Sequence, residues 1–252
     1  METSAFVASR RRALVAASAS ALLLGSAAFS AARAANWTQT PASGMGDVAV
    51  GPDGRVWLAG RNGTVWSSPD GQRFAQSEGS GFSRVAVGGD GTVWGVGSNG
   101  TVWKLINGRW TQTPASGMAD AAVGPDNRLW LAGRNGTVWW SNDGLNFTQT
   151  EASGFRRLSV GRDGTVWAVG GNETLWKFVD GRWTQTPASG MGDVAAGPDG
   201  RVWLAGRNGT VWHTDDGRNF TRVEASGFES VAAGPDGALW AVGANGTLWV
   251  YR

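Results

Sequence analysis

The chain has 252 residues, including 40 Gly and 16 Trp, with one His and no Cys. Without Cys it has neither a disulfide framework nor a lipoprotein attachment site, and one His cannot supply a Cys/His dyad or a typical set of metal ligands. With 22 Lys and Arg against 20 Asp and Glu, the formal net charge is +2.

The first 35 residues are typical of an export signal rather than of a folded domain. Ser9–Arg12 resembles a bacterial twin-arginine signal, an apolar stretch follows, and Ala32–Ala34 fits a small-residue cleavage pattern. An ordinary Sec signal peptide is the alternative, and either route exports the protein. Ser and Gly interrupt the apolar stretch, so we expect no membrane span in the mature protein.

Removal of this signal changes the charge balance. Cleavage after it would remove four Arg and one Glu and leave 18 basic against 19 acidic residues. A mature chain without a basic surplus is a poor match for phosphate backbones, so we exclude nucleic acid as a partner.

Residues 36–252 consist of six repeats with a spacing that alternates between 36 and 37 residues. A fixed period in this range is typical of an array of like supersecondary units. Each repeat has a first Trp and a second Trp nine residues later. The first members are Trp57, Trp94, Trp130, Trp167, Trp203 and Trp240.

Each repeat contains short runs rich in Val and Trp, separated by turn sequences of the Gly-x-Asp-Gly and Asn-Gly types. Such runs predict strands, and Asn-Gly between apolar runs predicts a hairpin. The strands are apolar on both faces, which favours sheets packed around an axis. The sequence thus predicts an all-β, six-bladed β-propeller of four-stranded antiparallel blades. A three-lobed trefoil is the alternative.

The two ends of the repeat array complement each other. The last repeat has three strands, over 231–233, 239–242 and 247–251, and Asn36–Thr40 resembles the missing outer strand. We expect this N-terminal strand to complete the last blade, because a closed ring leaves no exposed sheet edge.

Two repeats depart from the turn pattern. Asn127 replaces a turn Gly, and Asn tolerates the left-handed conformation that this position requires. Glu173 follows Asn172 where the other repeats have Gly. Because Glu is disfavoured there, we expect the turn to shift onto Gly171–Asn172.

The run from Gly89 to Trp103 and that from Gly234 to Trp249 resemble the tectonin repeat, with variants in the other four units. The resemblance covers residues 36–252. Propellers of this family include tachylectin-1-like and fungal tectonin lectins, so it implies binding of carbohydrate, including lipopolysaccharide or methylated sugars. It assigns no ligand contact to a residue of this chain.

A second resemblance concerns the loops that begin at Ser68, Ser141 and Thr214, which are similar to the Asp-box turn of sialidase-like propellers. In that family the turn is structural. Sialidase chemistry also needs a Tyr nucleophile within an acidic and Arg-rich site, whereas the single Tyr is Tyr251 near the chain end. We therefore expect no enzyme activity, no catalytic residue, no metal and no cofactor.

The odd repeats differ from the even ones, so that the period is also 73 residues. Odd repeats share a Met-x-Asp loop and an Arg-Asn-Gly turn, which a four-stranded meander places at the same end of the blade. Arg and Asn donors with an Asp acceptor suit a sugar site. The candidate ligand residues are Arg61, Arg134, Arg207, Asn62, Asn135, Asn208, Asp47, Asp120 and Asp193. An Arg–Asp surface pair copied by duplication is the alternative.

These observations together predict an exported lectin that presents several glycan sites on a propeller, in the periplasm or outside the cell. Its partners would be glycans or lipopolysaccharide, and we expect a monomer. A non-catalytic scaffold that binds a protein partner is the alternative function.

Overall fold

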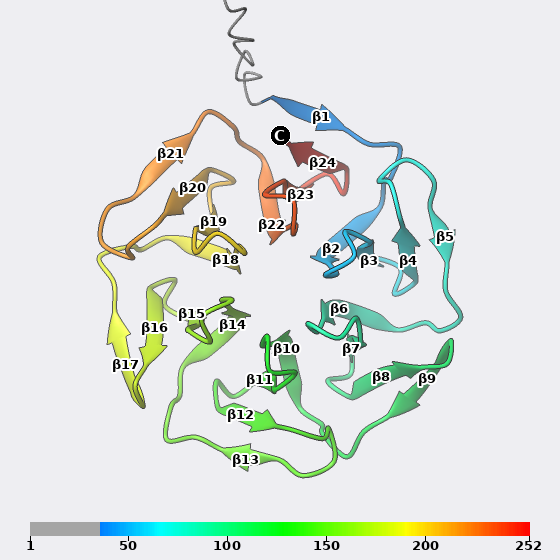
Figure 1. Ribbon diagram of the computed structural model, residues 1–252, viewed down its shortest axis with the longest axis horizontal. Coiled ribbons are helices and arrows are strands. Elements are labelled where there is room, and N and C mark those ends of the chain that lie inside the picture. The colour runs from blue at the N-terminus through cyan, green and yellow to red at the C-terminus, as the bar shows by residue number, and fades with distance from the viewer. Residues whose placement is uncertain (1–35) are drawn as a thin grey trace, which may run out of the picture. The chain divides into compact units, whose positions relative to one another are not determined.

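The computed structural model describes residues 36–252, so the expected export signal in residues 1–35 lies outside the described residues. The described residues form six four-stranded antiparallel sheets, which stand as blades around one axis (Figure 1). The predicted six-bladed β-propeller is confirmed, and the trefoil is excluded. Within residues 36–252, no helix is long and apolar enough to cross a membrane.

Each blade is a meander that runs from an inner strand at the axis to an outer strand at the circumference (Figure 1). From blade one to blade six, the inner strands are β2 (Met45–Val50), β6 (Phe82–Val87), β10 (Met118–Val123), β14 (Phe155–Val160), β18 (Met191–Ala196) and β22 (Phe228–Ala233). The second strands are β3 (Val56–Gly60), β7 (Val93–Gly97), β11 (Leu129–Gly133), β15 (Val166–Gly170), β19 (Val202–Gly206) and β23 (Leu239–Gly243).

The third and fourth strands complete the blades. The third strands are β4 (Val65–Ser68), β8 (Val102–Ile106), β12 (Val138–Ser141), β16 (Leu175–Val179), β20 (Val211–Thr214) and β24 (Leu248–Tyr251). The outer strands are β5 (Ala75–Gln76), β9 (Arg109–Gln112), β13 (Thr148–Gln149), β17 (Arg182–Gln185), β21 (Thr221–Val223) and, for blade six, β1 (Trp37–Gln39).

The N-terminal strand closes the ring as predicted. Strand β1 pairs antiparallel with β24, with Trp37 opposite Tyr251 and Gln39 opposite Trp249. The backbone N–H of Asn36 also donates to the carbonyl of Arg252 at 3.0 Å. The two ends of the propeller therefore share one blade, and the outer edge of β24 is paired instead of exposed.

The core lies between neighbouring blades. The second strands are buried along their whole length in five of the six blades, and Leu58, Leu131 and Leu204 in them are fully buried. Burial of such a side chain contributes about 1.5–3 kcal/mol. The apolar character of both strand faces is thus explained by blades that pack on each side.

The Asn-Gly-Thr-x-Trp pattern of the hairpins forms a chain of hydrogen bonds. In blade three, the Oγ1 hydroxyl of Thr137 donates to Oδ1 of Asn135 at 2.7 Å. The indole Nε1 of Trp139 then donates to Oγ1 of Thr137 at 3.0 Å. The same Trp–Thr bond recurs in every blade. It fixes the second Trp of each repeat on its hairpin.

Two exceptional turns have different outcomes. Asn127 takes φ 61°, so the left-handed prediction is confirmed. The shift expected in blade four is wrong: Glu173 itself takes φ 68°, and its N–H donates to the carbonyl of Gly170 at 2.9 Å, as the Gly residues of the other hairpins do. Holding Glu in this region costs about 1–2 kcal/mol, which an ion pair described below partly offsets.

The Asp-box loops are turns between the third and outer strands of the odd blades. In blade three, Oδ1 of Asp143 accepts from the N–H groups of Leu145 and Asn146, both at 2.8 Å. These backbone bonds hold the pKa of Asp143 well below its usual range. The loop residues Gly71, Gly144 and Gly217 lie against Trp240, Trp94 and Trp167 of the preceding even blades.

Candidate functional site

One end of the propeller, here called the rim face, carries the loops into the inner strands and the turns between second and third strands. In blade one the N–H of Arg61, in the turn, donates to the carbonyl of Gly44, in the loop, at 2.8 Å. The same bond joins Arg134 to Gly117 and Arg207 to Gly190. The two motifs of the odd repeats therefore do meet at one end of each blade.

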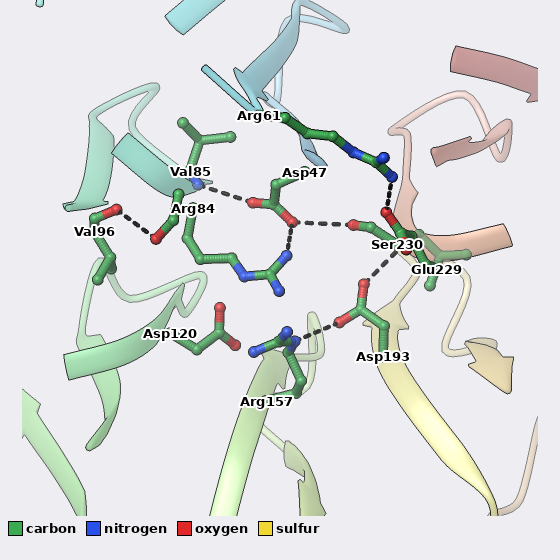
Figure 2. Close-up of polar contacts among 12 residues, drawn as sticks. Asp47, Arg61, Arg84, Val85, Val96, Asp120, Arg157, Asp193, Glu229 and Ser230 are labelled. Atoms are coloured by element: carbon green, nitrogen blue, oxygen red, sulfur yellow. Dashed lines mark hydrogen bonds and ion pairs between the residues drawn. The ribbon is translucent and has the colours of Figure 1, made fainter. Parts of the chain in front are cut away.

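A β-bulge in the inner strand separates the Arg and Asp side chains that the sequence suggested would share one site. The register shifts at this point in all six blades, as between Met45 and Asp47 in blade one. Such a bulge changes the direction of the following side chain. The residue in the bulge stays at the rim face, and the next residue points toward the propeller axis (Figure 2).

The three candidate carboxylates consequently lie on the axis and not on the rim. Asp47, Asp120 and Asp193 are 6–7% exposed. They alternate with Arg84, Arg157 and Ser230, which follow the bulges of the even blades (Figure 2). We call these six residues the axial ring. The alternative of a surface pair between Arg61 and Asp47 is wrong, because Asp47 faces the axis and Arg61 turns away toward Glu229 (Figure 2).

The carboxylates of the axial ring hold neighbouring blades together. Asp47 accepts from the N–H of Val85 at 2.9 Å, from Nη1 of Arg84 at 2.7 Å and from the hydroxyl of Ser230 at 3.0 Å. The N–H groups of Leu158 and Val231 donate in the same way to Asp120 and Asp193 at 2.8 and 3.0 Å. Each Asp thus links its odd blade to the following even blade.

The charges of the axial ring do not balance, since it holds three carboxylates and two guanidinium groups. Nη1 of Arg84 pairs with Asp47 at 2.7 Å, and Nε of Arg157 lies 3.7 Å from Asp193. Asp120 has no ion pair within the described residues. Burial, together with the neighbouring Asp193 and Asp47 and despite the opposing effect of Arg157 and Arg84, raises the pKa of Asp120 to about 7.

The side chain of each candidate arginine contacts the even blade that precedes its own blade in the ring. Arg61 donates to the carbonyl of Ala244 at 2.8 Å and pairs with Glu229. Arg134 donates to the carbonyl of Ser98, and Nε of Arg207 lies 3.3 Å from Glu173. All three arginines are exposed. Ala244, Ser98 and Glu173 belong to the turns between the second and third strands of the even blades, whereas Glu229 is the bulge residue of the inner strand β22.

The candidate asparagines are part of their own hairpins. Oδ1 of Asn62 accepts from both the N–H and the hydroxyl of Thr64, at 3.2 and 2.6 Å, and Asn135 and Asn208 do the same with Thr137 and Thr210. These bonds account for the asparagines structurally. Any contact of the Asn or Arg side chains with a glycan stays a prediction.

The even blades carry aromatic pockets, which the candidate residues taken from the odd repeats did not include. In blade four, a pocket of about 840 Å³ is lined by Phe155, Trp176, Phe178 and Trp183 together with the loop from Thr150 to Gly154. The ring centroids of Phe155 and Trp183 are 4.4 Å apart, and those of Phe178 and Trp183 are 5.1 Å apart. The pocket therefore presents a continuous aromatic surface.

Blade six has an equivalent pocket of about 440 Å³, lined by Trp37, Phe228, Trp249 and the turn residues Ala244 and Asn245. Its Trp37 and Phe228 rings stack at 4.4 Å. In blade two, the backbone of Gly79 lies close against Trp110, so that a Cβ at Gly79 would be 2.6 Å from the ring. Ala152 and Ala225 occupy this loop position in the other even blades.

The sequence carried a signal for these pockets. Even repeats have Phe at the start of the inner strand and Trp in the outer strand, where odd repeats have Met and Phe. In blade six the pairing became visible only with closure of the ring, because Trp37 lies almost 200 residues before Phe228. Nε1 of Trp37 and of Trp110 is buried without a hydrogen-bond partner among residues 36–252.

Other chemistry-bearing residues are dispersed. Residues 36–252 contain no group of three or more His, Asp and Glu placed to hold a metal ion. The single His, His213, is half-buried beside Trp203, at 5.1 Å between ring centroids. Burial and the neighbouring Arg201 lower its pKa.

Residues 140–252 match the family model described as the Tectonin domain, which confirms the expected resemblance to tectonin repeats. No curated protein matches the chain. Many solved structures do. A streptogramin B lyase matches with a TM-score of 0.61 at 15% identity, covering 86% of this chain and 97% of that one.

Two further solved structures show the same fold. A structural-genomics protein of unknown function from Bacteroides thetaiotaomicron matches with a TM-score of 0.72 at 14% identity, covering 87% of this chain and 76% of that one. The protein YCF48 from Cyanidioschyzon merolae matches with a TM-score of 0.57 at 17% identity, covering 86% and 98%. At such identities these likenesses bear on the fold alone.

Proposed function

We propose that this tectonin-repeat propeller is a carbohydrate-binding protein that holds glycans in the aromatic pockets of its even blades. The observation that carries the proposal is the blade-four pocket, where four aromatic side chains line a cavity of about 840 Å³ at the rim face. Aromatic faces suit the apolar faces of pyranose rings, and the pocket is large enough for one or two sugar units.

The odd-blade arginines support these pockets from outside. Arg61 and Arg207 contact Ala244 and Glu173, which lie in the turns that border the pockets of blades six and four. We therefore assign Arg61 and Arg207 to positioning these turns and to polar contacts at the pocket edge, and Arg134 to the equivalent turn of blade two, at Ser98. The buried Asp47, Asp120 and Asp193 belong to blade assembly.

The pocket chemistry favours binding over catalysis. Glu151 is the one carboxylate among the residues that line the blade-four pocket, whereas glycoside hydrolysis uses a pair of carboxyl groups across the bond. Weak equivalent sites on one rigid disc also increase avidity on a dense glycan surface by about 10²–10⁴. Bacterial lipopolysaccharide or methylated sugars presented at a cell surface, reached after export, fit this mode of binding.

A glycan array with the purified chain tests the proposal, using Trp183→Leu as the variant. Leu keeps apolar volume but removes the ring face, so binding should weaken about tenfold or more at the blade-four site. Phe147→Leu in odd blade three is the matched control, because Phe147 is the equivalent aromatic residue, directly before the outer strand β13. It should bind as the parent does.

The outcomes separate the two functions considered. If Trp183→Leu and the parent bind the same glycans equally, the pocket assignment is wrong. If the array of bacterial and methylated glycans stays silent while a purified protein partner binds, the scaffold function replaces the lectin. A solved structure of YCF48, which is similar in fold to this chain, has a D1 peptide bound.

A further inference from the structure

Another cavity at the rim face is lined by charged residues, in contrast to the two aromatic pockets. It encloses about 330 Å³ and is lined by four arginines from three consecutive blades, together with small or apolar residues. The arginines are Arg134 from blade three, Arg156 and Arg157 from blade four and Arg207 from blade five. We call this cavity the basic hollow.

Small residues make room for the guanidinium groups. Ala119, Gly170 and Gly192 form part of the lining. A Cβ on the neighbouring Gly171 would come within 3.1 Å of Nε of Arg156. The other even blades have Ser98 and Ala244 at the position of Gly171, so blade four alone leaves this space free for an Arg side chain.

The positive charge in the basic hollow is incompletely neutralised. Arg134 and Arg156 form no ion pair within the described part of the chain, and Arg134 only donates to the carbonyl of Ser98. Nε of Arg157 lies 3.7 Å from Asp193 and is buried without a hydrogen-bond partner. Arg207 alone lies close to an exposed carboxylate, that of Glu173 at 3.3 Å.

The 73-residue repeat, which occurs three times in the ring, is not kept at the residues of the basic hollow. The bulge residue that is Arg156 in blade four is Ser83 in blade two and Glu229 in blade six. Glu229 neutralises Arg61, and Ser230 replaces the arginine that follows the bulge. Within residues 36–252, one of the three related positions therefore collects four arginines, and duplication alone does not account for it.

We propose that the basic hollow is a binding site for a phosphate monoester. Guanidinium groups bind phosphate oxygens through paired, charge-assisted hydrogen bonds, and several of them around one cavity match a dianion better than a single carboxylate. The cavity exceeds the size of one phosphate group, so it accommodates part of the organic group that carries the phosphate. The basic hollow borders the blade-four pocket, with which it shares Gly170, but its proposed ligand does not depend on glycan binding.

Calorimetric titration of the full chain at low salt tests the proposal, with inorganic phosphate and glucose 6-phosphate as probes and glucose as the uncharged comparison. We expect glucose 6-phosphate to bind and Arg156→Ser, which installs the blade-two residue, to weaken binding about tenfold or more. Arg162→Ser removes the same charge from an exposed turn of blade four outside the hollow. It should leave binding unchanged.

A second variant tests the role of Arg207. Glu173→Gly frees Arg207 and relieves the φ of 68°, so it should tighten phosphate binding while raising the thermal midpoint. Trp183→Leu should leave phosphate binding intact, which separates this site from the glycan proposal. Three results would overturn the inference: no binding of either phosphate probe, equal binding by Arg156→Ser and the parent, or equal losses in Arg156→Ser and Arg162→Ser.

Discussion

Odd and even blades have the same four strands and the same bulge, but they place different chemistry on them. Odd blades put Asp after the bulge, where it links to the following blade, and press an Asp-box Gly against a Trp of the preceding blade. Even blades put Phe and Trp where those residues line open cavities, and the basic hollow takes arginines from both kinds of blade. The comparison indicates that odd blades mainly join the ring, whereas even blades present its aromatic binding surfaces.

The most damaging change to the odd-blade links should be Asp47→Asn. It removes the charge partner of Arg84, which is largely buried, and breaking such a pair costs about 3–5 kcal/mol. Chemical denaturation would measure the loss. A loss below about 1 kcal/mol would show that the axial ring does not hold the blades together.

The Asp-box contact is the next largest effect. Gly144→Ala adds a Cβ that clashes with the ring of Trp94 at a φ of 75°, while Gly164→Ala meets nothing within 4 Å at a φ of 82°. The control isolates backbone strain of about 1 kcal/mol. Gly144→Ala should cost about 3 kcal/mol, because the clash adds to that strain. If urea titration shows equal losses of stability in Gly144→Ala and Gly164→Ala, packing of this loop against Trp94 does not stabilise the ring.

All six blades share the hydrogen bonds that link Trp, Thr and Asn in the hairpin. Breaking these bonds should therefore destabilise odd and even blades equally. Thr137→Val in an odd blade and Thr174→Val in an even one each leave a Trp indole without its acceptor, at a cost of about 1–2 kcal/mol. Only Thr174→Val should also weaken glycan binding, because Trp176 lines the blade-four pocket. Loss of binding in both variants would argue against sites confined to even blades.

The pH dependence of stability tests the charge imbalance in the axial ring. Folding raises the pKa of Asp120 from 3.8 to about 7, so the folded chain holds a proton there that the unfolded chain has lost. Stability should therefore be greatest near pH 4 and fall as the pH rises to 7, by at most about 1.4 kcal/mol per pH unit for this group.

Asp120→Asn should flatten that fall, leaving the slope from Asp193, whose pKa burial also raises. The groups facing Asp120 are Arg157, Arg84, Asp193 and Asp47. Asp70, Asp143 and Asp216 have lowered pKa values, so the stability that they contribute changes with pH only below pH 4. Thermal midpoints measured from pH 4 to 8 test this assignment. If the midpoint of Asp120→Asn depends on pH as that of the parent does, Asp120 is not the group responsible.

The fold was predictable because periodicity and turn chemistry act locally. Asn-Gly turns, two-faced apolar strands and the unpaired Trp37 segment together predicted blade count, strand order and closure. The turn at Glu173 was mispredicted because tertiary contacts, including Arg207, hold a strained residue in place.

The site was only partly predictable, and the bulge explains why. One extra residue per inner strand turns Asp47 inward and leaves Arg61 outside, which no pattern in the repeat signals. The blade-six pocket combines residues from both ends of the chain, and the basic hollow combines residues from three blades. These residues come together only when the ring is formed, whereas the blade-four pocket lies within one repeat.

The division between odd and even blades is tested most directly by ¹⁹F NMR of the chain labelled with fluorotryptophan, titrated with a glycan that it binds. Signals can be assigned by single Trp→Phe substitutions. Resonances of Trp37, Trp176, Trp183 and Trp249, which line the even-blade pockets, should shift, while those of Trp66, Trp139 and Trp212 in the odd blades stay in place. Shifts confined to the odd-blade tryptophans would contradict the account.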